Sequence, residues 1–318
     1  MKFALQLLLV TLLALPCEVN AQTCSASASP VSFGSVSPIA RTAVTATGTV
    51  NVTCTWPATA TDSYVKVCLN IGGTSPRFLV NGSAAMQYDL YQDAAHSVAW
   101  GSVYYGTPPI SLTLARPAGG THLTQTVTVY GQLASNQPTI PTVGNSSTVY
   151  AQTFGGNTTS VNYAFYQFAA PPCSSITGSA GTFPFTASAT VINDCYINAT
   201  NISFTSVGAL GTSLNANGSI TAQCTSGDAW RIALNGGSSG SVGGRTMQRS
   251  GGGGTVNYQL YSDASHTVAW GDGTASTTAA SGVGTGYQQI INVYGVVPPQ
   301  TTPAPGTYSD TITATISF

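Results

Sequence analysis

Apolar and polar residues alternate with a period of two along several short segments of this chain. Over residues 124–130, Val127 and Val129 fall on one face of an extended backbone and threonines fall on the other. Residues 311–318 repeat this alternation, with apolar positions at Ile312, Ala314, Ile316 and Phe318. Such segments, bounded by Gly, Pro, Asn and Ser, are typical of half-buried β-strands. Because no amphipathic helical pattern follows Ala21, the sequence predicts an all-β protein.

A long motif occurs twice in the chain, once in each half. Residues 88–101 read YDLYQDAAHSVAWG and residues 258–271 read YQLYSDASHTVAWG, so ten of the fourteen positions are identical. Shorter matches surround both copies in the same order. We therefore predict two tandem β-sandwiches, one over residues 22–172 and one over residues 173–318.

Residues 1–21 have the pattern of a secretory signal peptide. Lys2 precedes an apolar run over residues 3–15, which is too short to span a bilayer, and a stretch of small residues ends at Ala21. We expect cleavage of residues 1–21 before Gln22 and export through the Sec pathway. The alternative, a lipoprotein acylated at Cys17, fits less well because a proline precedes that cysteine.

Charged residues make up only 5% of the chain, 8 basic against 9 acidic, where about 25% is typical. The net charge of −1 provides no basic surface for a nucleic acid. Two histidines, His96 and His266, each follow an aspartate by three residues, at Asp93 and Asp263. Because both copies repeat this pair, we interpret it as a structural hydrogen bond rather than an acid–base site. We expect no enzymatic activity, no metal site and no cofactor.

Six of the 7 cysteines lie beyond the predicted signal peptide, and an even number in an exported chain predicts disulfides. Each copy contains two cysteines at nearly the same separation, and we pair these within the copy. The two that remain pair with each other, as a clip from the first domain to the proline-rich linker. The expected disulfides are Cys24–Cys54, Cys195–Cys224 and Cys68–Cys173.

The two copies differ in the segments that flank them. An additional alternating segment at 183–191 precedes the second copy, with apolar positions Phe183, Phe185, Ala187, Ala189 and Val191. Only Gln22 and Thr23 separate the predicted cleavage site from Cys24, and the second copy ends on its alternating strand at Phe318. We expect the second sandwich to lack its final strand. Such a domain exposes an apolar groove and an unpaired edge, which a strand from elsewhere can fill.

Three repeated or local motifs resemble the spore coat U domain family. They are Tyr-x-Leu-Tyr-x-Asp…Trp-Gly and Val-Tyr-Gly in both copies, and Gly-Thr-Tyr-Ser-Asp-Thr at 306–311. The resemblance covers essentially the whole mature chain. This family is similar to the subunits of archaic (Csu-type) chaperone–usher pili, and the tandem form resembles their tip adhesin. The resemblance implies an immunoglobulin-like, pilin-type sandwich without its final strand, which a periplasmic chaperone and then the next subunit's N-terminal extension supply.

These features predict how the chain assembles. An internal pilin donates a strand from its N-terminus, and the mature chain has none to donate, so we expect it to stand at the pilus tip. Within the chain, we expect residues 183–191 to complete the first domain, with residues 160–168 as a rival donor. The chaperone or next subunit is expected to pair along the strand that carries Ile312, Ala314, Ile316 and Phe318.

Three loops of the first copy are more apolar or proline-rich than those of the second. They carry Trp56, Pro57, Val103, Tyr104, Tyr105, Pro108, Pro109, Ile110 and Ile140. Stiff apolar loops present contact area at a low ordering cost, so we expect them to bind an abiotic or host surface. The alternative is that these side chains cap the core or contact the other domain.

The sequence therefore predicts a fimbrial tip adhesin of the chaperone–usher pathway that mediates surface attachment and biofilm formation. Its expected partners are a periplasmic chaperone, an outer-membrane usher and the next pilus subunit. The expected location is the periplasm in transit and then the fimbrium. One alternative is a polymerising cell-surface or spore-coat structural protein without an adhesive role. Another is a secreted carbohydrate-binding module.

Overall fold

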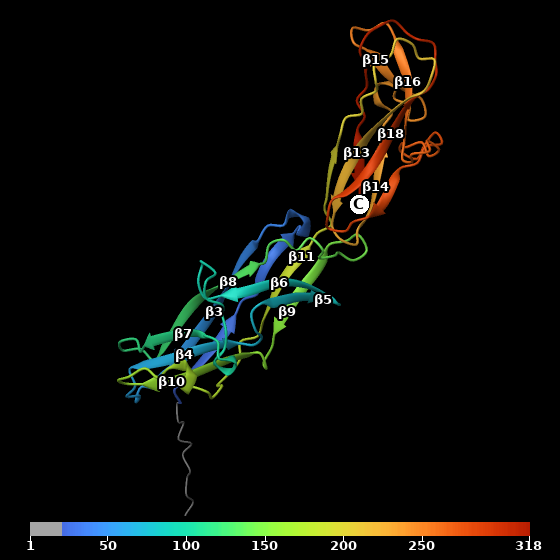
Figure 1. The fold of residues 1–318 in the computed structure, drawn as a ribbon. Helices are drawn as coiled ribbons and strands as arrows, with labels where there is room; N and C mark the ends of the chain where they lie inside the picture. The colour runs from blue at the N-terminus through green and yellow to red at the C-terminus, as the bar shows by residue number, and fades with distance from the viewer. Residues whose placement is uncertain (1–20) are drawn as a thin grey trace, which may run out of the picture.

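The computed structural model describes residues 21–318, so the predicted signal peptide, apart from Ala21, lies outside the described residues. Two β-rich domains follow each other along the chain and lie end to end (Figure 1). Helical residues among those described form only 3-10 turns of 3 residues. The predictions of an all-β chain and of two tandem sandwiches are confirmed.

The first domain places two sheets around one apolar core. The larger sheet has eight strands in the order β1-β3-β8-β6-β5-β9-β11-β2. These are β1 (Thr23–Ala28), β2 (Val31–Val36), β3 (Val44–Thr55), β5 (Arg77–Asn81), β6 (Ala84–Tyr91), β8 (His122–Leu133), β9 (Thr148–Phe154) and β11 (Phe185–Val191). The smaller sheet contains β10 (Thr159–Tyr166), β4 (Tyr64–Ile71) and β7 (Ile110–Ala115), in that order. Alternate residues of each strand point into the core between the sheets.

Trp100 lies at the centre of this core and is fully buried. Its ring stacks on Phe183 and on Phe185, with 5.8 Å between ring centroids in each pair. Its indole Nε1 donates a hydrogen bond to the carbonyl oxygen of Leu69 at 2.9 Å, which satisfies the one polar atom of the side chain. Full burial of a large apolar side chain stabilises a fold by roughly 1.5–3 kcal/mol.

The second domain repeats most of this arrangement. Its larger sheet has the order β12-β13-β18-β16-β15-β19 and its smaller sheet the order β17-β14-β20. The strands are β12 (Cys195–Ala199), β13 (Leu214–Cys224), β14 (Ala229–Leu234), β15 (Arg245–Arg249), β16 (Thr255–Tyr261), β17 (Ala280–Val283), β18 (Gln289–Val297), β19 (Tyr308–Ser309) and β20 (Ala314–Ser317). The first six strands of the larger sheets correspond in order. Only the first domain adds two more, β11 and β2, within the described residues.

The structure contains three disulfides, Cys24–Cys54, Cys195–Cys224 and Cys68–Cys173. The first two join matched neighbouring strands, β1 to β3 and β12 to β13. The third joins β4 to the segment between β10 and β11. The first two pairs are those expected from the cysteine spacing, and the third is the pair expected between the two cysteines that remained.

The domains meet at a joint in which residues 192–194 connect β11 to β12. The side-chain amide of Asn145 binds the backbone of Ala229, donating to its carbonyl oxygen at 2.8 Å and accepting from its N–H at 2.9 Å. Thr142 donates its hydroxyl to the buried carboxylate of Asp228. Burial raises the pKa of this carboxyl, and the hydrogen bond from Thr142 opposes the shift. The joint is therefore held by polar contacts as well as by the connecting chain.

Candidate functional site

Strand β11 lies between β9 and β2 in the larger sheet of the first domain. It pairs antiparallel with β9 along its whole length, from Phe185 opposite Phe154 to Val191 opposite Thr148. Its other edge pairs with β2 in parallel orientation. Every second residue of β11 is buried and the residues between them are half-exposed. The segment 173–191, which the sequence-based boundary places in the second domain, thus packs with the first.

The segment that leads into β11 is fixed by a small polar network. Asn162 on β10 donates to the Ile176 carbonyl and to the Tyr104 hydroxyl, both at 2.7 Å. The Tyr104 hydroxyl in turn donates to the carbonyl oxygen of Thr177 at 2.9 Å. The rival donor, residues 160–168, contributes instead to β10, which pairs with β4 in the smaller sheet.

Matched tyrosines show which strand of the second domain corresponds to β9. Tyr88 donates its hydroxyl to Gln152 on β9 at 2.6 Å, and Tyr258 donates to Asp310, directly after β19, at 2.6 Å. Strand β19 therefore corresponds to β9, and Tyr308 takes the place of Tyr150. Beside β9 lies β11, whereas no strand of the described second domain lies in this position beside β19.

The smaller sheets can be matched in the same way. The buried tryptophan of each repeat donates its indole N–H at 2.9 Å, to the carbonyl of Leu69 in the first domain and of Ile232 in the second. Val161 lies opposite Leu69, and Ile316 lies opposite Ile232. Ile316 on β20 therefore corresponds to Val161 on β10.

Five apolar positions that are buried around β11 in the first domain are half-exposed in the second. In the first domain they are Val31, Phe33, Tyr150, Phe154 and Val161. Their counterparts at the edge of the second core are Ile202, Phe204, Tyr308, Ile312 and Ile316. Ile202 and Phe204 pack over Gly295 of β18 as Val31 and Phe33 pack over Gly131 of β8. We call these five counterparts the acceptor groove. The groove is apolar and has a free strand edge. An incoming β-strand with alternating side chains can place its apolar side chains in the groove and hydrogen-bond its backbone to the edge.

The residues expected to pair with a chaperone or subunit lie along one side of this groove. Ile312 and Ile316 belong to the acceptor groove, Ala314 is half-exposed and Phe318 is exposed. Strand β20 pairs with β14 on one side, and its other edge has no strand partner within residues 21–318. In the first domain, the matched edge at Val161 exchanges backbone hydrogen bonds of 2.9 Å with residues 180–181.

A carboxylate supports the strand edge at one end of the groove. Burial opposes the ionisation of Asp310, but hydrogen bonds from Ser238 and Tyr258 outweigh burial and lower the pKa of the carboxyl. The Ser238 N–H and hydroxyl donate to one carboxylate oxygen, and the Tyr258 hydroxyl donates to the other. The ionised carboxylate thus connects the β19 edge to the loop before β15 and to β16.

The expected surface-binding loops are only partly exposed. Trp56 is fully buried with its ring perpendicular to that of Phe165, and Ile110 is buried at the start of β7. Tyr104 and Tyr105 are 50% and 57% exposed. Pro57, Val103 and Pro109 are half-exposed, and Pro108 is exposed. The expectation of a surface role is wrong for Trp56 and Ile110, because their side chains fill the core.

Ile140 is also buried, and its loop faces the other domain. Pro141 forms a parallel β-bridge with Ser226 of the second domain. Gly286 approaches the Pro138 carbonyl so closely that a side chain on this glycine would collide with it. The expectation that Ile140 binds a surface is therefore wrong: the proline-stiffened loop is part of the domain joint.

The most exposed large apolar side chain of the first domain lies elsewhere. Phe168 is 91% exposed, and nearby Tyr64 is 40% exposed and stacks on Tyr166 with ring centroids 5.6 Å apart. Because β4 starts where β7 and β10 end, the loops at 56–63, 116–121 and 167–172 share one end of the domain. We call them the distal loops. They lie at the end of the first domain that is far from the second domain (Figure 1).

The sequence reasoning missed Phe168 because its segment was assigned to a strand and a linker. The signal was present in the run Gln-Phe-Ala-Ala-Pro-Pro at 167–172, which has no polar residue after its glutamine. The other distal loops carry Pro and Ala as well. The Arg116 guanidinium donates to the Ala60 carbonyl at 2.8 Å and so fixes two of these loops against each other.

The recurring aspartate–histidine pairs shape turns. Asp93 accepts hydrogen bonds from the backbone of Val98 and from Ser97, which lower the pKa of its carboxyl. Asp263 makes the same contacts in the second domain. Both histidines adopt positive φ values near 55°, a conformation that turns favour. The aspartate and the histidine themselves are joined through the backbone, with the histidine N–H donating to the aspartate carbonyl oxygen at 3.1 Å in both domains. The pair is therefore structural, but the carboxylates bind the residues after the histidines and not the imidazole rings.

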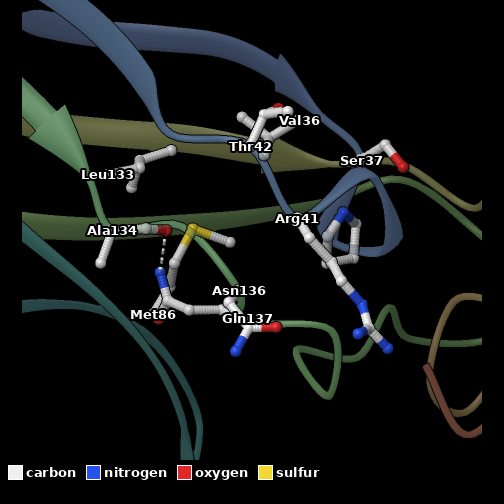
Figure 2. A pocket seen from close by; sticks show the side chains of 10 residues that line it. Val36, Ser37, Arg41, Thr42, Met86, Leu133, Ala134, Asn136 and Gln137 are labelled. Carbon is white, nitrogen blue, oxygen red and sulfur yellow. Dashed lines mark hydrogen bonds between the residues drawn. The ribbon is translucent and has the colours of Figure 1, made fainter. Parts of the chain in front are cut away.

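Two pockets lie on the first domain. One, of about 20 Å³, lies between Arg41, Met86 and Gln137 (Figure 2), which is room for roughly one water molecule. The other, of about 240 Å³, lies beside Arg77 and Pro108 and is smaller than the roughly 300–1,000 Å³ of typical ligand sites. Residues 21–318 contain no group of three or more His, Cys, Asp or Glu residues placed to hold a metal ion. In the same part of the chain, no helix is long and apolar enough to cross a membrane.

Comparison with known proteins agrees with the repeat. The family model described as Spore Coat Protein U domain matches residues 8–154 and 181–315. Protein U of Myxococcus xanthus is 35% identical over 116 residues, which are 35% of this chain and 64% of that protein. The chain thus spans less than two thirds of the length of this relative.

A solved structure from Acinetobacter baumannii has a similar fold over both domains. It is the CsuC-CsuE chaperone-tip adhesion subunit pre-assembly complex from archaic chaperone-usher Csu pili. The match has a TM-score of 0.51 and 18% identity, and it covers 93% of this chain and 100% of the matched one. The two sandwiches in tandem are therefore a pilin-type fold.

Proposed function

Because the chain belongs to the Spore Coat Protein U domain family, we propose that it is a pilus tip subunit assembled by the chaperone–usher pathway. The observation that carries the proposal is the difference between the two domains. In the first, five apolar positions are buried beside β11 and the segment that leads into it, and in the second their counterparts form the open acceptor groove. A strand supplied by another polypeptide would complete the second domain as β11 completes the first.

The proposed occupants of the acceptor groove are a periplasmic chaperone during transit and the next pilus subunit after assembly at an outer-membrane usher. Both would present an extended segment to the unpaired edge of β20 and to β19. An exposed apolar edge of this kind promotes aggregation unless it is covered. A chaperone that fills the groove would therefore also keep the subunit soluble after its export to the periplasm.

A position at the tip follows from having one complete and one open domain. The first domain contains its own completing strand and needs none from a partner. The subunit therefore accepts a strand only at its second domain, and the first domain points away from the rest of the fibre. This geometry places the distal loops at the outermost end.

We assign surface attachment, and through it biofilm formation, to the distal loops. Phe168 and Tyr64 are exposed there among Ala and Pro residues, and exposed apolar area of this kind is a common feature of binding surfaces. Proline-stiffened loops lose little entropy on contact. Attachment would rest on apolar contact with an abiotic or host surface rather than on charge. The role is structural and adhesive rather than enzymatic.

The groove can be tested with a peptide that this chain itself provides. A synthetic peptide with the sequence of residues 183–191 should bind the second domain and protect the amides of β19 and β20 from hydrogen exchange. At 100 times its Kd, a ligand specific for the folded state adds about 2.7 kcal/mol of stability. A peptide with aspartate at the position of Ala187 is the matched control, because it places a charge among apolar side chains.

Matched variants localise the effect. Ile312→Asp should abolish peptide binding, whereas Thr311→Asp, on the exposed neighbour, should leave it intact. Co-expression with a periplasmic chaperone should give a soluble complex that the same Ile312→Asp substitution prevents. The proposal would be refuted by a soluble monomer whose second domain is stable without any partner and does not bind the peptide.

A further inference from the structure

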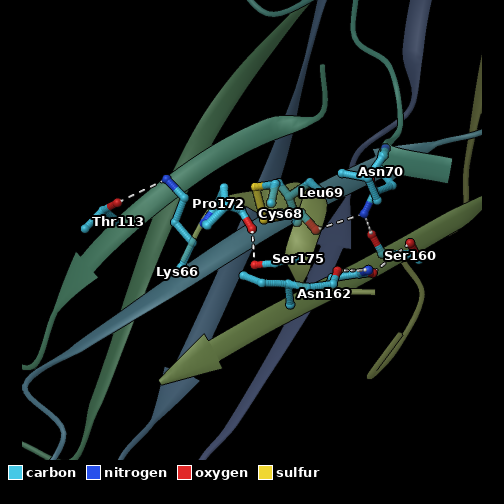
Figure 3. Close-up of a disulfide and its surroundings, with 12 residues drawn as sticks. Lys66, Cys68, Leu69, Asn70, Thr113, Ser160, Asn162, Pro172 and Ser175 are labelled. Atoms are coloured by element: carbon cyan, nitrogen blue, oxygen red, sulfur yellow. Dashed lines mark hydrogen bonds between the residues drawn. A yellow bond between two sulfur atoms is a disulfide. The ribbon is translucent and has the colours of Figure 1, made fainter. Parts of the chain in front are cut away.

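The disulfide Cys68–Cys173 has no counterpart in the described second domain. Cys68 is a buried residue in the middle of β4, and Cys173 follows Pro172 in the segment that leads into β11. Figure 3 shows Cys68 beside Pro172. Ser175 donates its hydroxyl to the Pro172 carbonyl at 2.8 Å. Since Leu69 matches Ile232, the position of Cys68 is held by Arg231 in the second domain. The bond is therefore a feature of the self-completed domain alone.

Once the polar contacts of the domain joint break, the same segment carries the tension between the domains. Strand β11 continues through residues 192–194 into β12, so a pull on the second domain reaches the first at Val191. The hydrogen bonds of β11 to β9 and β2 resist this pull along the strand direction. If β11 leaves the sheet, the next covalent attachment to the first domain is Cys173.

We propose that Cys68–Cys173 is a mechanical stop that limits how far the first domain can be extended and keeps the detached β11 beside its own groove. When β11 is pulled out, only the chain from Cys173 to Cys195 can lengthen before β4 takes the load. This inference rests on the covalent connectivity of the first domain and not on the proposed pilus role.

The connectivity sets the maximum length. The disulfides of the first domain bypass loops of 30 and 105 residues. A fully unfolded but oxidised domain therefore transmits force only through the chain from Cys54 to Cys68 and from Cys173 to Cys195. At about 3.4 Å per residue, this covalent path is about 120 Å long. Without Cys68–Cys173 it lengthens by 105 residues, or about 360 Å.

The stop also affects the return of the strand. Only the short run over residues 174–182 separates Cys173 from Phe183, the first apolar position of the completing segment. A tether this short keeps the segment at an effective concentration in the millimolar range near its groove. Re-insertion of β11 therefore starts from a segment that is held close to its groove even while the rest of the linker is extended.

Single-molecule force spectroscopy on the oxidised chain, residues 22–318 with handles at both ends, tests the proposal. The variant Cys68→Ser/Cys173→Ser should lengthen the unfolding step of the first domain by about 360 Å and leave that of the second unchanged. Removing Cys195–Cys224, which bypasses 29 residues, is the control: Cys195→Ser/Cys224→Ser should lengthen only the step of the second domain, by about 100 Å.

Equal first-domain steps in the wild type and the Cys68→Ser/Cys173→Ser variant would overturn the stop. If that variant does not fold, the wild type is compared with and without dithiothreitol, and reduction must lengthen the first-domain step by more than the 30 residues that Cys24–Cys54 accounts for. In repeated pull and relax cycles, the wild type should recover its first-domain step more often than the variant. Equal recovery would overturn the tethering role.

Discussion

Replacing Phe185 with alanine removes the largest inward side chain of β11 itself. The ring of Phe185 is buried, lies 4.6 Å from that of Phe154 and 5.8 Å from that of Trp100, and belongs to the core of the first domain. Truncation of a buried phenylalanine lowers the free energy of unfolding by about 3–5 kcal/mol, because apolar burial is lost and a cavity remains. The whole loss should fall on the first domain.

Native-state hydrogen exchange measures this loss domain by domain. At about 1.36 kcal/mol per tenfold change, protection of the β9 and β2 amides should fall by about two to four orders of magnitude. Protection of the β13 and β18 amides in the second domain should stay the same. Thr186→Ala, on the outward face of the same strand, is the control and should change stability by no more than about 0.5 kcal/mol. A loss under about 1 kcal/mol for Phe185→Ala, far below the expected range, or a loss located in the second domain, would refute the assignment of β11 to the first core.

Three further predictions separate stability from attachment. Phe168→Ser should weaken binding to a hydrophobic surface in a quartz-microbalance assay while shifting the free energy of unfolding by about 0.5 kcal/mol or less, because the side chain is 91% exposed. Trp56→Ala, at the same end of the domain, should lower stability instead. It should cost about 3–5 kcal/mol in urea unfolding, since the ring is buried against Phe165. The lowered pKa of Asp310 makes its contribution to the second domain complete above the unfolded-state pKa of about 3.9, and the contribution is lost as the pH falls through the folded value. Asp310→Asn should flatten this acid dependence of the unfolding midpoint, and an unchanged slope would contradict the role given to the carboxylate.

The repeat made much of the fold predictable. Two copies of one motif gave the number of domains, and matching cysteine separations gave the disulfide partners without any coordinates. The donor segment was also predictable, because the alternation from Phe183 to Val191 stands apart from either copy. In each case the information lies in periodicity or spacing, which the sequence displays directly.

The surface loops were less predictable for a physical reason. Composition shows that a residue is apolar but not whether the loop that carries it turns toward the core, the other domain or solvent. Trp56, Ile110 and Ile140 all turn into the core of the first domain, although the loop that carries Ile140 also contacts the second domain at Pro141. Phe168 turns outward because β10 ends shortly before it, at Tyr166. These choices depend on where strands end in space, and such ends are set by packing rather than by local sequence.

The acceptor groove is also incomplete in its backbone. Strand β9 spans 7 residues in the first domain, where β11 pairs with all of them, whereas β19 spans 2 residues in the second. The two stretches nevertheless correspond, since Gln152 within β9 and Asp310 directly after β19 bind matched tyrosines. β19 is therefore shorter than β9 because it has no partner strand on that side, and not because its sequence differs in pattern. An incoming strand would cover apolar side chains and would also give residues 306–312 the ladder that their counterparts have, so that binding and strand extension occur as one step.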